Sequence, residues 1–156
     1  MRILVMSDSH GHYYQMYLAI TQQPTATAVV LLGDGSQEMD EIEEQFSCDA
    51  RKFYRVRGNC DWGSDLPIYT VEIFGGKRFY CTHGFMEKVK YGDEGLISAA
   101  RGFNADIALF GHTHNPRISY EDGLYLFNPG SIADGNYGVV DVTEQGIMCI
   151  NMKIRY

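Results

Sequence analysis

Short apolar runs of four to six residues recur along the first two thirds of the chain, with glycine or polar residues close behind them. They occupy residues 3–6, 28–32, 53–56, 69–74, 78–82 and 107–110. Runs of this length with flanking glycines predict buried strands. Between the first three runs, apolar residues recur every three or four positions, which predicts two amphipathic helices.

The apolar face of the first helix is formed by Tyr13, Met16, Tyr17 and Ile20, and that of an acidic second helix over residues 38–45 by Ile42 and Phe46. A third helix is expected over residues 94–102. The alternation of strand and helix favours a partly parallel, layered α/β fold.

The Gly75-Gly76 pair between two of the runs indicates a hairpin, so the strand over residues 69–74 should be antiparallel to the next one. After Pro116 the pattern predicts antiparallel strands over residues 117–120, 123–127, 138–142 and 147–154. No repeat or low-complexity tract divides the chain, so we expect a single domain over residues 1–156.

Side chains that can bind a metal follow five of the predicted strands: Asp8 and His10, Asp34, Asn59, His83, and His112 with His114. In open α/β sheets the carboxyl ends of the strands line the ligand crevice. We therefore expect these five segments to deliver their side chains to one rim of the sheet. The strand over residues 69–74 is the exception, because a hairpin strand should end at the opposite edge.

Each of these residues also has a purely structural interpretation. Asp8 could cap the following helix, Asn59 could occupy a left-handed turn position, and His83 could be a buried histidine with satisfied hydrogen bonds. The whole set resists this interpretation, because four of the five histidines lie in these strand-end segments. The fifth, His12, is assigned to the surface or to a supporting position.

The types of ligand indicate the class of metal. Carboxylates, one amide carbonyl and several imidazoles suit manganese, iron or zinc better than calcium or copper(I). Seven ligands exceed the three of a typical catalytic zinc, but they divide between two ions if one carboxylate bridges. Two such ions, about 3.5–4 Å apart, can clamp a phosphoryl group. The expected cofactors are therefore two divalent ions, manganese foremost, with iron, zinc or nickel as alternatives.

Composition limits the partners of the chain. The formal charge of −7 argues against nucleic acid and anionic lipid as partners, so a phosphate substrate must be attracted by local positive charge such as a metal cluster. Four widely spaced cysteines without a CxxC pair favour a reducing compartment. The apolar run near the N-terminus is too short for a signal peptide, and no run approaches the roughly 20 residues that span a bilayer. We expect a soluble cytoplasmic protein, with self-association left open.

Taken in order, the five polar segments resemble the calcineurin-like metallophosphoesterase superfamily. Its five sequence blocks are matched by Asp8-x-His10, Gly33-Asp34, Gly58-Asn59, His83 and Gly111-His112-x-His114. The short length, Gly-Asn-Cys-Asp at residues 58–61 and Asn-Pro-Gly-Ser at residues 128–131 are similar to the YfcE-type phosphodiesterases of bacteria and archaea.

This resemblance implies a two-sheet β-sandwich flanked by helices, with the metal site at the carboxyl ends of the strands. It implies one metal held by Asp8, His10, Asp34 and His114, and a second held by Asp34, Asn59, His83 and His112. The implied activity is hydrolysis of small soluble phosphodiesters by a hydroxide between the metals, with Asp34, Asn59 and His83 as catalytic residues.

Two positions depart from the family pattern. Cys60 stands where many members have a histidine, and a thiol with an ordinary pKa of about 8.5 is a weaker general acid. We therefore expect better turnover of esters whose leaving groups depart easily, such as aryl phosphodiesters. Gln37 replaces an acidic residue that often follows the Gly-Asp block, so we do not expect the supporting contacts that an acid makes there.

Two other functions stay open. Cys60 is the one feature that favours a scaffold protein of the same fold, and the acidic charge argues against the other alternative, a nuclease. Asp61 is expected either to orient Asn59 or to form a turn, and Arg57 either to reach a substrate phosphate or to pack at the surface. Residues 128–131 are a hypothetical lining of the site's mouth. Cys48, Cys81 and Cys149 are expected to be small core residues.

Overall fold

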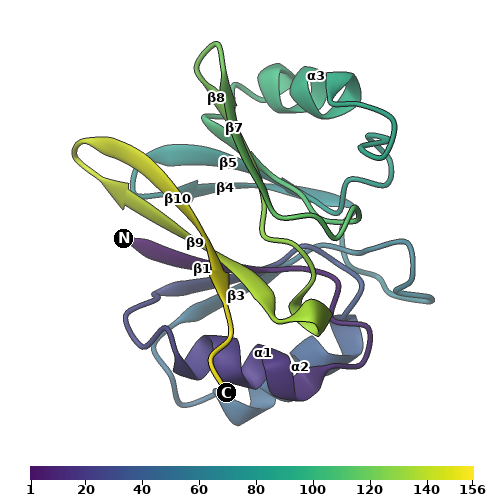
Figure 1. Ribbon diagram of the computed structural model, residues 1–156, viewed down its shortest axis with the longest axis vertical. Helices are drawn as coiled ribbons and strands as arrows, with labels where there is room; N and C mark the ends of the chain where they lie inside the picture. Colours follow the sequence, from purple (N-terminus) through teal and green to yellow (C-terminus); the bar gives the residue numbers. More distant parts are fainter.

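The computed structural model describes residues 1–156 as two five-stranded sheets packed face to face, with helices on their outer faces (Figure 1). The first sheet has the order β10-β9-β1-β2-β3. Its strands are β1 (Arg2–Met6), β2 (Ala28–Leu31), β3 (Lys52–Arg55), β9 (Asn136–Thr143) and β10 (Gly146–Lys153). The second has the order β4-β5-β6-β8-β7. Its strands are β4 (Tyr69–Phe74), β5 (Lys77–Thr82), β6 (Ile107–Leu109), β7 (Arg117–Glu121) and β8 (Leu124–Asn128).

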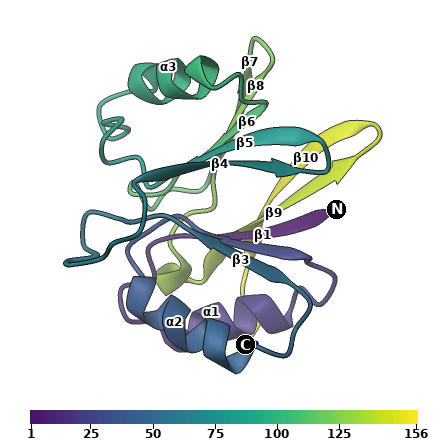
Figure 2. The same cartoon turned by 180° about the vertical axis from the view of Figure 1, so that it is seen from behind.

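The helices divide between the two outer faces, as both views of the ribbon show (Figure 2). Helices α1 (Tyr13–Thr21) and α2 (Ser36–Gln45) cover the first sheet, and α3 (Glu94–Gly102) covers the second. A short 3-10 turn, η1 (Ile132–Asp134), precedes β9. The predicted fold class, a two-sheet β-sandwich flanked by helices, is thus confirmed.

Strand β1 shows why the apolar runs are continuous. Ile3 and Val5 point into the core between the sheets, whereas Leu4 and Met6 point into the core beneath α1 and α2. All four side chains are fully buried. Since successive side chains alternate between the faces of a strand, a strand covered on both faces needs apolar residues at every position.

Two sets of parallel strands determine where polar loops gather. In the first sheet β1, β2 and β3 are parallel, and in the second β5, β6 and β8 are parallel. The expectation that every strand after Pro116 is antiparallel is wrong for β8, which pairs in parallel with β6. The reason is that β7 forms the sheet edge and β8, reversed by the β7–β8 hairpin, runs in the same direction as β6.

The predicted hairpin between β4 and β5 is present, with Tyr69 opposite Thr82 and Phe74 opposite Lys77. The prediction for Cys48 is wrong: this residue is exposed, because the chain leaves α2 at Gln45 and turns over the surface. No helix combines the length and the apolar character that crossing a membrane requires.

Candidate metal centre

The predicted ligands meet where the carboxyl ends of the two parallel strand sets face each other. They form two groups, and the first consists of Asp8, His10 and His114. Oδ1 of Asp8 lies 3.2 Å from Nε2 of His114 and 3.8 Å from Nε2 of His10. The two Nε2 atoms are 3.4 Å apart. Residues from the loop after β1 and from the loop after β6 therefore converge, although 104 positions separate the two histidines in the sequence.

The second group is centred on His83. Its Nε2 lies 2.9 Å from Oδ1 of Asn59 and 3.1 Å from Nδ1 of His112. Asp34 stands between the groups, with Oδ2 3.3 Å from Nε2 of His83 and 3.9 Å from Nε2 of His10. The single rim expected from the sequence is thus shared by two sheets, since β1, β2 and β3 belong to one and β5 and β6 to the other.

Five of these seven residues have a left-handed backbone, which non-glycine residues rarely adopt. They are Asp8 (φ 57°), His10 (φ 43°), Asp34 (φ 55°), His112 (φ 66°) and His114 (φ 62°). Only three other non-glycine residues in the chain have a positive φ: Lys88, Asn104 and Asp122. Strained backbone persists where the surroundings hold it, and it concentrates at functional sites. The concentration at this rim supports a functional role for the cluster.

The carboxylate of Asp8 is fully buried and only half satisfied. Its Oδ2 accepts hydrogen bonds from the Ser7 hydroxyl (2.6 Å) and the His112 amide (3.1 Å), whereas Oδ1 has no hydrogen-bond partner. Asp8 does not cap α1, whose N-cap is His12. A buried carboxylate oxygen aimed at imidazole nitrogens is suited to a cation, so the residues present fit a divalent metal.

Asp34 and His83 perturb each other. Burial would raise the pKa of Asp34, but its hydrogen bond to His83, the charge of that ring and the Cys60 amide lower it to about 2. Burial would lower the pKa of His83, but Asp34 and Asp8 outweigh burial and raise it. The two carboxylates therefore create a strongly cation-attracting field in the middle of the cluster.

His112 has the opposite character. Burial, followed by repulsion from His83 and Lys90, lowers the pKa of its imidazole to about 4. The ring is therefore neutral at pH 7, which is the form that coordinates metals. Nδ1 faces His83, while Nδ1 of His83 itself lies 2.7 Å from the Leu32 carbonyl. That contact leaves Nε2 of His83 directed at the cluster.

Glycines allow the ligand loops to touch. A Cβ atom on Gly58 would overlap the carboxylate and the amide of Asp34. One on Gly111 would overlap the Ser7 hydroxyl and lie 2.9 Å from Oδ2 of Asp8. These two positions need glycine because backbone must lie directly against the carboxylates.

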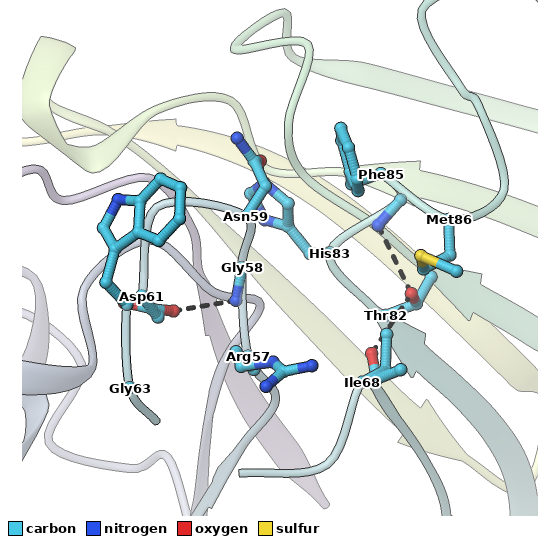
Figure 3. A pocket seen from close by; sticks show the side chains of 12 residues that line it. Arg57, Gly58, Asn59, Asp61, Gly63, Ile68, Thr82, His83, Phe85 and Met86 are labelled. Carbon is cyan, nitrogen blue, oxygen red and sulfur yellow. Dashed lines mark hydrogen bonds between the residues drawn. The ribbon is translucent and has the colours of Figure 1, made fainter. Parts of the chain in front are cut away.

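Asp61 connects two of the ligand loops. Its Oδ2 accepts from the amides of Asp34 (2.8 Å) and Gly58 (2.7 Å; Figure 3). Its Oδ1 accepts from the amides of Gly35 and Ser36, both at 3.0 Å, and from the Ser36 hydroxyl at 2.8 Å. The carboxylate therefore caps the N-terminus of α2, where negative charge is favourable. Asp61 positions the loops that carry Asp34 and Asn59 through their backbone, and it also forms a turn, because its own amide donates to the Gly58 carbonyl at 3.3 Å.

We expect Asp61→Asn to lower the free energy of unfolding by about 3 kcal/mol, because an amide nitrogen cannot accept the hydrogen bonds of two backbone amides. Burial would raise the pKa of Asp61, but bonds from Ser36, Gly58 and Asp34 lower it. The contribution of Asp61 is therefore complete above its unfolded pKa near 3.9 and is lost as the pH falls through the folded value.

Urea denaturation at pH 7 and below pH 4 measures both effects. The exposed Asp65→Asn, on the same loop, serves as the control and should change stability by no more than about 0.5 kcal/mol. A difference between wild type and Asp61→Asn that does not shrink in acid would contradict this account.

Asn128 supports the histidine loop from behind. Its Nδ2 donates to the Gly111 carbonyl (2.9 Å) and the Thr113 hydroxyl (3.1 Å), and its Oδ1 accepts from the Gly130 amide (2.9 Å). The side chain is fully buried. The hypothesis that residues 128–131 line the mouth of the site is wrong, because all four are buried. The parallel orientation of β8 carries them to the rim beneath the ligands.

Asn128→Ala should lower the free energy of unfolding by about 2–4 kcal/mol, since it leaves the buried Gly130 amide without a partner and removes two hydrogen bonds to the loop of Gly111 and Thr113. Thermal denaturation followed by circular dichroism measures the loss. Asn115→Ala, an exposed asparagine near the same loop, should stay within about 0.5 kcal/mol of wild type. Equal stability of the two variants would show that the Asn128 bonds are dispensable.

Three other residues complete the surroundings. The Cys60 thiol lies with His10 and Asp34 in a third group whose ligand atoms are within 4.8 Å of one another, a proximity that sequence reasoning missed. Burial and then the charge of Asp34 raise the pKa of this thiol, so it stays protonated at neutral pH. His12 is exposed and lies outside the cluster, with Nδ1 2.9 Å from the Ser9 carbonyl. Glu38, the residue after Gln37, accepts a hydrogen bond from the Gly11 amide and so supports the edge of the site.

Comparisons with known proteins agree with this arrangement. Residues 1–145 match the calcineurin-like phosphoesterase superfamily domain. Phosphodiesterase YfcE of Escherichia coli is 28% identical over an alignment of 178 residues, covering 97% of this chain and 93% of that protein. A Streptococcus pneumoniae protein described as a predicted phosphoesterase superposes with a TM-score of 0.83 and 25% identity, covering 97% of this chain and 88% of the other. Zinc-bound Vps29 of Entamoeba histolytica has the same fold, with a TM-score of 0.76, 21% identity, and coverage of 99% and 100%.

Proposed function

The chain belongs to the calcineurin-like phosphoesterase superfamily, and from this premise we propose that it is a metal-dependent phosphodiesterase acting on small phosphate esters. The observation that carries the proposal is the gathering of seven potential ligands into two groups that share Asp34. Together with the unpartnered Oδ1 of Asp8, this arrangement supports a dinuclear rather than a mononuclear centre.

We assign the residues to two sets of metal ligands, and Asp34 would belong to both. Asp8, His10 and His114 would complete the first set, and Asn59, His83 and His112 the second. Two divalent ions would supply a net charge of about +2 after the two carboxylates are counted, which attracts a phosphate to an acidic protein, and they would acidify a bound water. Manganese is our first assignment, with iron, zinc and nickel as alternatives that the same donors accept.

The chain's own residues orient these groups. His83 is held by the Leu32 carbonyl and Asp34 by the Cys60 amide, so neither side chain must reorganise when substrate binds. The protonated Cys60 thiol lies beside Asn59 and can donate a proton to a departing oxygen only weakly. Turnover should therefore depend steeply on how easily the leaving group departs.

The test combines metal analysis of the purified protein with a panel of phosphomonoesters and phosphodiesters at matched leaving groups. We expect two metal ions per chain and faster turnover of 4-nitrophenyl diesters than of 4-nitrophenyl phosphate. One metal per chain would contradict the dinuclear centre. A protein that holds two metals but hydrolyses no ester would instead support the scaffold alternative, a function compatible with the shared Vps29 fold.

A further inference from the structure

A cavity of about 480 Å³ opens beside the metal cluster and shares two of its residues, Asn59 and His83. The rest of its wall is largely apolar, with Trp62, Ile68, Phe85 and Met86. In Figure 3, Asn59 and His83 lie on one side of Phe85 and Met86, and Arg57 lies below them. Any ligand anchored at Asn59 and His83 therefore has this wall within reach.

The large apolar side chains of this wall are unusually exposed to solvent. Trp62, the only tryptophan of the chain, is 91% exposed, and Met86 and Phe85 are 61% and 52% exposed. Single exposed apolar side chains are common, but several large ones around one cavity mark a binding surface. Covering them on ligand binding would remove apolar area from water.

Arg57 gives this cavity a cation. Its Nη1 donates to the Ser64 carbonyl at 3.2 Å, and its guanidinium forms no ion pair with any carboxylate. A guanidinium has five N–H donors, so most of them stay available. A cation next to aromatic rings and a methionine suits a flat aromatic group, which can stack on the rings and attract the cation to its face.

A second cavity, of about 850 Å³, adjoins the first. It shares Asn59, Phe85 and Met86 with the first, but its further lining has two cations and only one aromatic side chain of its own: Lys88, Lys90, Tyr91 and His112. A phosphodiester carries two ester groups, and two cavities that flank Asn59 can receive one each. The apolar one is the better match for an aromatic group.

We propose that the substrate is a phosphodiester with a flat aromatic ester group, which binds in the cavity formed by Arg57, Trp62, Phe85 and Met86. This inference rests on the proposed function, since the metal cluster must anchor the phosphate. It adds a recognition site for one substituent, distinct from any effect of the leaving group on the rate.

The test measures binding, not turnover. Benzyl(methyl)phosphinate and (cyclohexylmethyl)(methyl)phosphinate mimic a diester, have no hydrolysable P–O–C bond, and differ only in whether the six-membered ring is aromatic. We expect the metal-loaded wild type to bind the benzyl compound about fivefold more tightly in calorimetry, the order expected for an aromatic pair. The fluorescence of Trp62, the single tryptophan, should change on that binding.

In Trp62→Leu the two phosphinates should bind equally, whereas Tyr120→Leu, which removes a 61% exposed tyrosine on β7, should keep the preference. Equal affinities in the wild type, or a preference that survives Trp62→Leu, would overturn the inference. Binding of inorganic phosphate distinguishes a failure of the proposed function from a failure of the aromatic site alone. Wild type that binds neither phosphate nor either phosphinate overturns the proposed function as well, whereas binding of phosphate without a ring preference overturns only the aromatic site.

Discussion

Asp34→Asn is expected to lower the hydrolysis of an aryl phosphodiester at least about a thousandfold. Asp34 reaches both ligand groups, with Oδ2 3.3 Å from Nε2 of His83 and 3.9 Å from Nε2 of His10. The asparagine keeps the size of the side chain and its acceptor for the Cys60 amide, but it removes the charge. Metal ions supply several kcal/mol of transition-state stabilisation, and each 1.36 kcal/mol is a factor of about ten in rate.

Steady-state kinetics with 4-nitrophenyl diesters and metal analysis of the same preparations measure this effect. Metal content should fall from two ions per chain to one or none. Asp65→Asn provides the control, because it removes an exposed carboxylate on the loop that follows the Asn59 segment. Wild-type turnover by Asp34→Asn in the presence of metal would show that the chemistry takes place elsewhere.

The second large effect is expected on metal removal. Chelation followed by dialysis should abolish turnover and destabilise the fold, because Oδ1 of the fully buried Asp8 has no hydrogen-bond partner in the metal-free protein. Metal at a thousand times its dissociation constant adds about 4 kcal/mol to the free energy of unfolding. For a chain of this length, this corresponds to a rise in Tm of roughly 10 °C. Differential scanning calorimetry before and after addition of manganese measures it.

Asp8→Asn distinguishes this explanation from non-specific effects of a chelator. The variant should lose the metal-dependent rise in Tm together with activity. Without metal it should be at least as stable as wild type, because an amide nitrogen in the place of Oδ1 can donate to the His114 ring 3.2 Å away. A metal-dependent rise in Tm equal to that of wild type would show that manganese stabilises some other part of the chain.

The effects expected for Asp34→Asn and for metal removal have a common cause: the arrangement that would bind metal makes the metal-free protein less stable. Buried carboxylates with a missing partner and left-handed backbone at five ligands oppose folding of the metal-free chain. The surrounding structure compensates through residues such as Asp61 and Asn128, which bond to the loops and not to the metals. Substitutions at these supporting positions should therefore affect stability and activity together, whereas Asp8→Asn separates them.

The helices, the strands and the ligand residues could be predicted from the sequence because each is associated with a local sequence pattern. A strand covered on both faces requires an unbroken apolar run, as in residues 3–6, and the polar residue that ends it stands at the carboxyl end. Asp8, Asp34 and His83 were found in this way. The failed prediction for Cys48 shows the limit of residue type alone, since a small apolar residue is tolerated equally well at the surface.

The tertiary structure alone decided which strands lie side by side, in which direction they run, and which groups form hydrogen bonds. The period of an apolar pattern reports which face of a strand is buried, but it carries no information on which strand lies beside it. For this reason the parallel pairing of β8 with β6, the sharing of the site by two sheets and the cavity between Arg57 and Trp62 could not be predicted. The roles of Asp61 and Asn128 were undecided for the same reason, because a hydrogen bond depends on which backbone amides and carbonyls the fold brings within about 3 Å.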